Sequence, residues 1–468
     1  MPSRCRLFVL VAALTVGAPT AASATEPLSL DDVLQSVGQT HPAVEAADRG
    51  VDRARGKELA AKGGFDPELK ITGKYAPVGY YRNGQIDVLA RQATPAWGLG
   101  VFAGYRLGLG TYPTYRSGQQ TLSGGEMRAG IDIPIWRDGP IDARRAKIQK
   151  TKILRGGAER ARDATQLANE RKAASTYWAW VAAGQRLRVA RDLLAIAERR
   201  DAGLNEQAAA GAIERIKLVD NRRLVLDRMG KVVSAERDFE QASLALSLFL
   251  RDADANTVRV GEDRVPSAFP EPLRLDLAGD QAEVDAALQR RPDLAALDAS
   301  RDAARVDVRL AKNQRAPSVN IQSYVAKDIG EGIEELQPVE WGAGLVFAMP
   351  LPLRQARGDF RAAKAGLASV DAQRRGLRDR IGAEVRSALV SLRASEQSIT
   401  LARQQIDAAD RLADAERTRF NEGASDLVTV NLRELAAADA ANQEIDALAA
   451  YHRALADFLA ASGRSPAS

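Results

Sequence analysis

Cysteine and histidine are nearly absent from this chain of 468 residues, which has one cysteine, Cys5, and two histidines, His41 and His452. Cys5 lies in an N-terminal segment that we expect to be removed, so the remaining chain offers no disulfide, thiol nucleophile or cysteine metal ligand. The two histidines are far apart in sequence, and there is no P-loop, GxSxG motif or metal-spaced cluster. The sequence therefore predicts no enzyme, no cofactor and no metal site.

Long apolar runs are missing as well. Residues 1–24 have a basic start at Arg4 and Arg6, an apolar core from residue 7 to 16, and the small residues Ala22-Ser23-Ala24. These are the three parts of a secretory signal peptide, and the core is too short for the alternative, a membrane anchor. No run of 18 apolar residues follows. The formal net charge of +5 is small, which argues against a nucleic-acid partner.

Aromatic residues make up only 5% of the chain, and proline is absent from residues 356–420. An uninterrupted helix over this range would extend about 100 Å, and such a helix needs a partner along its side. Residues 425–462 supply it by folding back near Gly423, since glycine tolerates the positive φ that ends a helix. A second hairpin occupies about 141–250 and turns near Gly211. In its first arm we expect packing against a neighbouring helix by Tyr177, Trp178 and Trp180.

Residues 68–136 have the period of two that is typical of β-strands. Apolar side chains alternate with polar or small ones in ELKITGKYA from residue 68, WGLGVFAGYRLGLG from residue 97 and EMRAGIDIPIW from residue 126. Tyrosine and tryptophan crowd this window, as Tyr75, Tyr80, Tyr81, Trp97, Tyr105, Tyr112, Tyr115 and Trp136. Strands of this length with interfacial aromatics indicate a transmembrane β-barrel, and the alternative is a soluble sandwich with one wet face.

The chain also contains an internal repeat. Residues 291–317 align without gaps with residues 41–67, so that Pro42 falls on Pro292 and Pro67 on Pro317. Strand-like sequence and a long helical hairpin follow in both halves, which predicts two equivalent structural units. We therefore expect a first repeat at 25–250 (strands about 68–136, hairpin about 141–250), a proline-containing linker at 251–276, and a second repeat at 277–468 (strands about 318–352, hairpin about 356–462).

This plan, together with the segment RLADAERTRFNEGASDLVTVNLRELAAADA from residue 411, resembles the TolC-like outer-membrane efflux proteins. The specific elements are an aromatic residue three positions before a glycine, then Asp-Leu-Val-Thr-Val before a helix, and RPDL at the start of the second repeat. The resemblance covers essentially the whole mature chain. It implies a mainly α fold with a membrane β-barrel portion, built from two repeats of helix, strands and long helical hairpin.

The resemblance further implies a homotrimer in the outer membrane of a Gram-negative bacterium. Three chains would share one barrel of at least twelve strands in the lipid, and their helices would continue it as an α-helical barrel in the periplasm. At its far end this tunnel would meet a periplasmic adaptor (membrane fusion) protein bound to an inner-membrane pump, proton-driven or of ABC type. We therefore expect a passive channel of a tripartite efflux pump or type I secretion system, which exports drugs, metal ions or polypeptides.

Two groups of residues become candidate sites through this resemblance. The hairpin turns would form the adaptor-docking tip, made of Gly211, Gly423, Ala424, Ser425, Asp426 and Leu427. Acidic side chains would close the tunnel near the tip, where Asp407, Asp410 and Asp414 are spaced to share one helix face. A plainer interpretation stays open for each group: the glycines close turns, and the acidic residues are ordinary charges on a solvated helix.

The first repeat departs from the family plan of two strands per repeat. Its stretch between the first helical segment and the long hairpin is about twice as long as that of the second repeat. An extra hairpin that includes QIDVLARQA at 85–93 would enlarge the barrel, form an outer loop or fold inside the mouth. The alternative from another class of protein is a soluble periplasmic coiled-coil adaptor or scaffold. That class explains the helical hairpins but neither the alternating strands nor the whole-chain repeat.

Overall fold

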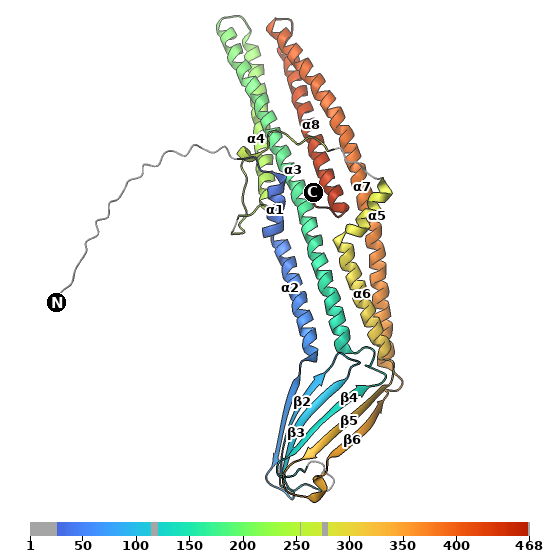
Figure 1. Cartoon of the computed structure of the whole chain (residues 1–468). Helices are drawn as coiled ribbons and strands as arrows, with labels where there is room; N and C mark the ends of the chain where they lie inside the picture. Colours follow the sequence, from blue (N-terminus) through green and yellow to red (C-terminus); the bar gives the residue numbers. More distant parts are fainter. Residues whose placement is uncertain (1–25, 114–119, 253, 274–278, 467–468) are drawn as a thin grey trace, which may run out of the picture.

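The computed structural model describes residues 26–113, 120–252, 254–273 and 279–466. The predicted signal peptide, with Cys5, and also Tyr115 lie outside the described residues. Long helices run from a single antiparallel sheet to two hairpin tips at the opposite end of the molecule (Figure 1). The predicted fold class, mainly helical with a strand portion and two repeats of helix, strands and long hairpin, is confirmed.

The first repeat begins with α1 (Leu30–Thr40) and α2 (Pro42–Lys62). The helices are separate because proline fits the first turn of a helix but cannot continue the one before it. A 3₁₀ turn at Gly63–Phe65 leads to the sheet. Four strands and the long hairpin follow: β1 (Glu68–Ala76), β2 (Asn83–Ala93), β3 (Gly100–Gly110), β4 (Glu126–Pro134), α3 (Ala143–Ala209) and α4 (Arg215–Ser247).

The second repeat has the same order of elements but two strands in place of four. Its elements are α5 (Asp280–Arg290), α6 (Pro292–Asn313), β5 (Ser318–Asp328), β6 (Glu340–Ala348), α7 (Arg354–Asn421) and α8 (Leu427–Ala461). Short 3₁₀ turns lie at Glu262–Arg264 and Glu334–Leu336. The extra hairpin expected in the first repeat is therefore β1–β2.

The helices form a layer with two long edges. Helix α3 contacts α4 and α2 on one side and α8 and α6 on the other, and α7 lies beyond α8 and α6. Helix α8 ends where α6 begins, since Arg291 Nη1 donates to the carbonyl of Ala461 at 3.4 Å. In the first repeat His41, before α2, stacks on Phe249, just after α4, with ring centroids 5.6 Å apart. One edge of the layer is thus α7, and the other is α4 continued by α2.

Each repeat has its own hydrophobic core where the short helices cover the long ones. The first joins α1, α3, α4 and the linker around the fully buried Trp180, with Tyr177 and Trp178 in the same cluster. The predicted packing of these three aromatic residues is confirmed. The second core joins α5, α6, α7 and α8 around Tyr451 and Phe458. No helix of the described part of the chain has a stretch long and apolar enough to cross a membrane.

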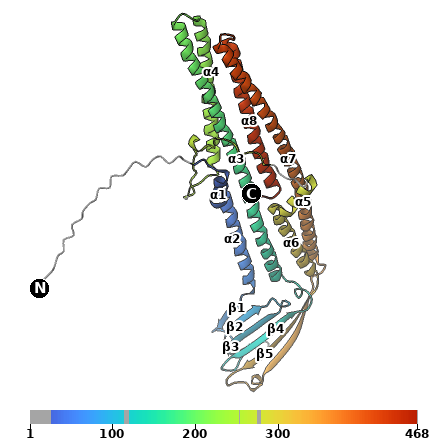
Figure 2. The ribbon, with the colours of Figure 1, turned by 45° about the horizontal axis from the view of Figure 1, so that its top comes forward.

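The sheet has the strand order β1-β2-β3-β4-β5-β6, with all neighbours antiparallel, and it is curved (Figure 2). β1 and β6 are its free edges. The hairpin β1–β2 is paired along its whole length, from Glu68 opposite Arg91 to Ala76 opposite Asn83. Of the three arrangements left open by the sequence, the structure has the one in which the hairpin widens the sheet.

Candidate functional site

The two hairpin tips have the same backbone structure. Gly211 and Gly423 have φ values of +74° and +75°, the left-handed conformation that glycine adopts without strain. The next residue, Ala212 or Ala424, donates its N–H to the carbonyl five residues earlier, on Gln207 or Arg419, at 2.8 Å. This is the Schellman motif, in which a glycine just past the helix end lets the last carbonyls find donors. Both predicted turn glycines therefore end a long helix.

The tip of the second repeat has additional side-chain contacts. Asp426 is the N-cap of α8 and accepts the N–H of Thr429 at 2.9 Å, and this hydrogen bond lowers the pKa of the Asp426 carboxyl. Ser425 donates its hydroxyl to the carboxylate of Glu416. Leu427 is buried, whereas Ala424 is exposed. Of the tip residues predicted from the sequence, Ala424 and Asp426 are therefore presented to solvent beside Gly423.

The three acidic candidates Asp407, Asp410 and Asp414 are all exposed on α7. Asp407 forms an ion pair with Arg411 at 3.0 Å, and Asp414 forms one with Arg417 at 2.6 Å. Asp410 has no hydrogen bond or ion pair to any described residue. The three carboxylates are thus exposed on α7, the outermost helix of the layer.

A buried ionic cluster joins the two hairpins below the tips. Glu434 of α8, 1% exposed, accepts from Arg228 of α4 at 3.1 Å and from Arg417 of α7 at 3.2 Å, and also pairs with Arg200 of α3. Burial raises the pKa of the Glu434 carboxyl, but the hydrogen bonds and charges of Arg200 and Arg228 outweigh it, so the pKa is lowered. One carboxylate therefore connects all four long helices.

This cluster was not predicted from the sequence, although a signal exists. The buried positions at the start of α8 are Leu427, Val430, Glu434, Ala437 and Ala440. Their spacing of three and four residues is that of one helix face, and Glu434 is the only charged member. A carboxylate buried on an apolar helix face needs a cation beside it, because an unpaired buried charge is strongly destabilising. The sequence does not say which arginines supply it, because three different helices do so.

A second contact between the repeats is built on aromatic rings at the level of the linker. His452 of α8 stacks on Trp178 of α3 with ring centroids 4.2 Å apart and on Phe269 of the linker at 5.8 Å. Its Nε2 lies 3.2 Å from the carbonyl of Pro270, and the adjacent Tyr451 donates its hydroxyl to Leu273. Burial lowers the pKa of His452 to about 4, so the ring is neutral at pH 7. His452 therefore has a packing role, as does His41, which caps α2.

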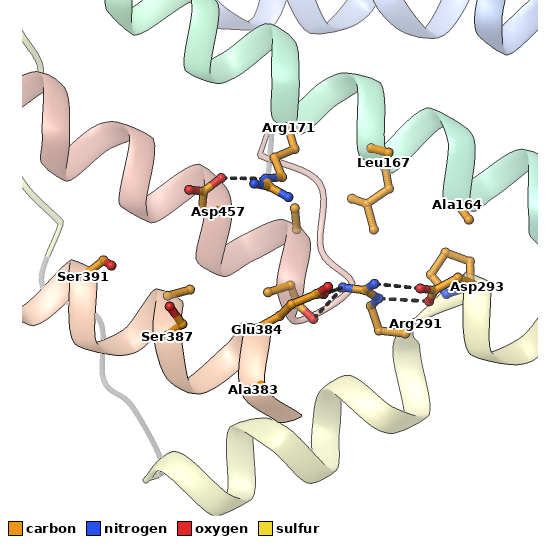
Figure 3. Close-up of a pocket in the computed structure, with 15 residues that line it drawn as sticks. Ala164, Leu167, Arg171, Arg291, Asp293, Ala383, Glu384, Ser387, Ser391 and Asp457 are labelled. Atoms are coloured by element: carbon orange, nitrogen blue, oxygen red, sulfur yellow. Dashed lines mark hydrogen bonds and ion pairs between the residues drawn. The ribbon is translucent and has the colours of Figure 1, made fainter. Parts of the chain in front are cut away.

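A cavity of about 550 Å³ lies where α8 ends and α6 begins, between α3 and α7 (Figure 3). Its walls are mostly alanine and serine, such as Ser387 and Ser391. Arg171 of α3 pairs with Asp457 of α8 at 2.6 Å across it, and Arg291 pairs with Glu384 of α7 at 2.9 Å (Figure 3). Because each cation already has a carboxylate, the cavity is a seam held by ion pairs between helices.

The two faces of the sheet differ in chemistry. One face is apolar and exposed, and its largest side chains include Leu69, Ile71, Met127, Ile131, Trp341, Leu345 and Phe347. The other carries Asp87, Arg106, Glu126 and Arg128, which form ion pairs with one another at 2.6–3.3 Å. These charged side chains are no more than 20% exposed, because side chains converge on the inside of a curved sheet. The apolar face is therefore the convex one.

Several aromatic residues predicted at the membrane interface have exposed rings at the ends of the strands. Tyr75 and Tyr80 lie at the end of the sheet far from the helices, and Trp97 and Trp136 lie at the near end; all four rings are more than half exposed. Two other aromatic residues of this predicted group form hydrogen bonds to the backbone. The hydroxyls of Tyr105 and Tyr112 donate to the carbonyls of Gly124 and Gly84. No group of three or more metal-binding side chains occurs among the residues described.

Comparison with known proteins finds a family model and solved structures that resemble this chain. Residues 284–464 match the family model described as outer membrane efflux protein. A crystal structure of a membrane protein from Pseudomonas aeruginosa is similar with 17% identity, 99% of both chains covered and a TM-score of 0.66. The CmeC outer membrane channel of Campylobacter jejuni is similar with 13% identity, coverage of 98% of this chain and 94% of that one, and a TM-score of 0.65.

The MtrE outer membrane channel of Neisseria gonorrhoeae, solved in its open state, is also similar, with 14% identity, coverage of 93% and 89%, and a TM-score of 0.65. No curated protein sequence matches the chain. At these identities the solved structures show the fold alone, whereas the family model matches the sequence of the second repeat itself. The resemblance to TolC-like outer-membrane efflux proteins, stated from the sequence, is thereby confirmed.

Proposed function

We propose that three copies of this chain form a passive channel. Two findings support this: the second repeat matches the outer membrane efflux protein model, and the chain has the fold of solved outer-membrane channels. The channel would cross the outer membrane of a Gram-negative bacterium and continue into the periplasm. The observation that carries the proposal is that the protomer is an open strip with two continuous edges. One edge runs along α4, α2 and β1, and the other runs along α7 and β6.

The chemistry of the two edges supports ring closure. Both helical edges have exposed apolar side chains at helical spacing, namely Ile216, Val219, Leu226 and Val233 on α4, and Val390, Leu401 and Leu412 on α7. β1 and β6 have nine residues each. Because the six strands alternate in direction, β6 of one copy would pair antiparallel with β1 of the next. Closure removes the unpaired strand edges, which are otherwise a hazard for aggregation.

The convex face of the sheet supports a lipid environment. A transmembrane barrel presents an apolar band with aromatic residues at both ends, and its inner face is polar. The sheet has both features. The experiment is extraction of the processed protein from membranes, followed by its mass in detergent and current measurements in planar bilayers. We expect a detergent-dependent trimer that conducts ions; a stable monomer soluble without detergent would refute the proposal and favour the periplasmic adaptor or scaffold.

We propose further that Asp407, Asp410 and Asp414 narrow the tunnel near the tips. Supporting this, all three are exposed on the free edge helix α7. Rings of carboxylates favour cations, so Asp410→Ala with Asp414→Ala should raise the conductance and weaken the cation selectivity. The matched control is Asp359→Ala, an exposed aspartate at the sheet end of the same helix. Equal currents from the double variant and the unchanged protein would show that Asp410 and Asp414 do not form the gate.

We propose that the tips dock a periplasmic adaptor protein that is bound to an inner-membrane pump. The exposed Ala424 and Asp426 beside Gly423, and the matching turn at Gly211, would form the contact. Because the one cysteine precedes residue 25, Ala424→Cys gives a single thiol in the processed chain for cross-linking in cells. Ser398→Cys, an exposed position midway along α7, is the control. Cross-links to a periplasmic protein from Ser398→Cys but not from Ala424→Cys would contradict docking at the tip.

A further inference from the structure

The hairpin β1–β2 has no counterpart in the second repeat. There, α6 ends at Asn313 and is followed directly by β5 and β6 and then by α7. In the first repeat α2 ends at Lys62, and β1 and β2 precede the pair β3–β4 that leads into α3. The described residues of each chain therefore supply six strands, where two repeats built like the second would supply four.

The added hairpin has the properties of a full part of the wall. β2 pairs with β3 along its entire length, from Asn83 opposite Gly110 to Ala93 opposite Gly100. The strand lengths of 9 and 11 residues equal those of the other four strands. Leu69, Ile71 and Tyr75 continue the exposed apolar face. The backbone of the hairpin thus lies within the sheet.

The side chains on the concave face of the sheet form a thin layer. The ring of Phe102 lies against Gly130, and the ring of Tyr324 lies against Gly342, where an added Cβ atom would collide with each ring. Leu89 covers Gly104 in the same way, since a Cβ there would be 2.9 Å from Leu89 Cδ1. Large side chains therefore lie flat along neighbouring strands over glycines. The charged side chains Asp87 and Arg106 also pair along the wall.

We propose that the sheet section of the assembled channel is a wall of eighteen strands that admits polymers and compact polypeptides, and so is not the size filter. This inference rests on the proposed trimer. With strands about 4.8 Å apart and tilted by about 40°, eighteen strands close at a diameter of about 36 Å, and twelve at about 24 Å. Side-chain layers of about 5 Å on each side leave free widths of about 26 Å and 14 Å. The free cross-section is then about three times larger with the added hairpin.

The test uses a thiol inside the sheet. Gly344 lies in β6 on the same face as Gly342, and an added Cβ there meets no atom within 4 Å. Gly344→Cys would be the single thiol of the processed chain, because Cys5 is in the predicted signal peptide. The purified trimer in detergent is treated with maleimides attached to inert spheres of graded diameter. We expect reaction with spheres up to about 25 Å across, and a limit near 14 Å overturns the inference.

The comparison variant lacks residues 68–97. This deletion joins Pro67 to Gly98 and imitates the second repeat, where Pro317 precedes Ser318 at the start of β5. In this background the same thiol should react only with spheres below about 14 Å. Equal limits for both proteins overturn the inference.

Should the deleted protein fail to assemble, the labelling limit of the full chain and the diameter of its sheet end in electron micrographs decide the question by themselves. A trimer that excludes large spheres overturns this inference alone. The absence of any trimer overturns the proposed function, and the inference with it.

Discussion

The buried carboxylate of Glu434 offers a direct test of what holds the two hairpins together. Glu434→Ala removes the acceptor shared by Arg200, Arg228 and Arg417, and leaves Arg228, which is 2% exposed, without its carboxylate partner. Breaking a buried ion pair from one side costs about 3–5 kcal/mol, because the remaining charge stays desolvated. The cluster lies close below both tips, so we expect the loss as local opening of the tips.

Hydrogen exchange of the backbone amides at 427–440 measures this opening. A loss of about 3 kcal/mol should accelerate exchange roughly 150-fold, since each 1.4 kcal/mol corresponds to a factor of about ten. Asp414→Ala is the control, because Asp414 pairs with Arg417 at the surface and such pairs contribute less than about 1 kcal/mol. The double variant Glu434→Leu, Arg228→Met removes the two most deeply buried charges of the cluster and should recover most of the loss.

Two outcomes would contradict this role of the buried cluster. If Glu434→Ala and Asp414→Ala accelerate exchange equally, burial of the carboxylate does not matter. If the double variant exchanges as fast as Glu434→Ala, the penalty does not come from the uncompensated charge of Arg228. In either case the buried carboxylate is not what holds the hairpins together.

Three further predictions concern other parts of the chain. His452 has an ordinary pKa of 6.5 and a folded pKa of about 4, so stability should fall as the pH drops below 6.5, by about 2 kcal/mol at pH 5. Thermal unfolding at pH 7 and pH 5 should show this loss in the unchanged protein but not in His452→Phe, and equal losses would contradict it. Gly423→Val should destabilise the tip by about 1–3 kcal/mol, because valine is strained at positive φ, whereas Gly366→Ala inside α7 should stabilise by roughly 0.5–1 kcal/mol. A stabilising Gly423→Val or a destabilising Gly366→Ala in urea unfolding would contradict this prediction. Trp180→Ala, which empties a fully buried site, should cost about 3–5 kcal/mol, and a loss under about 1 kcal/mol would show that the first core collapses around the cavity.

The strand register and the widened sheet illustrate where the sequence is informative. Alternation of apolar and polar residues in strands such as β1 fixes which side chains share a face, because the period of a strand is two. The same pattern does not say whether an added hairpin joins the sheet edge, hangs as a loop or folds inward. That choice depends on the unpaired edge of β3, and the backbone pairing of β2 with β3 settles it.

The ionic contacts between the repeats, by contrast, could not be predicted from the sequence. The chain has many arginines on alanine-rich helices, and many of them have carboxylates nearby in sequence. Arg291 pairs with Glu384, and Arg228 pairs with Glu434, because the helices that carry them lie side by side at those points. The distance between side chains on different helices depends on how the helices pack. Local sequence patterns do not show this packing.

By itself, the sequence determined the two long proline-free hairpins, their glycine turns at Gly211 and Gly423, the helix break at Pro42 and the repeat. Each of these follows from local backbone preference or from a short period along the chain. The tertiary structure alone decided the order of helices in the layer, the burial of Glu434 among three arginines and the stacking of His452 between the repeats. Those features need residues hundreds of positions apart to meet, and only the packed chain brings them together.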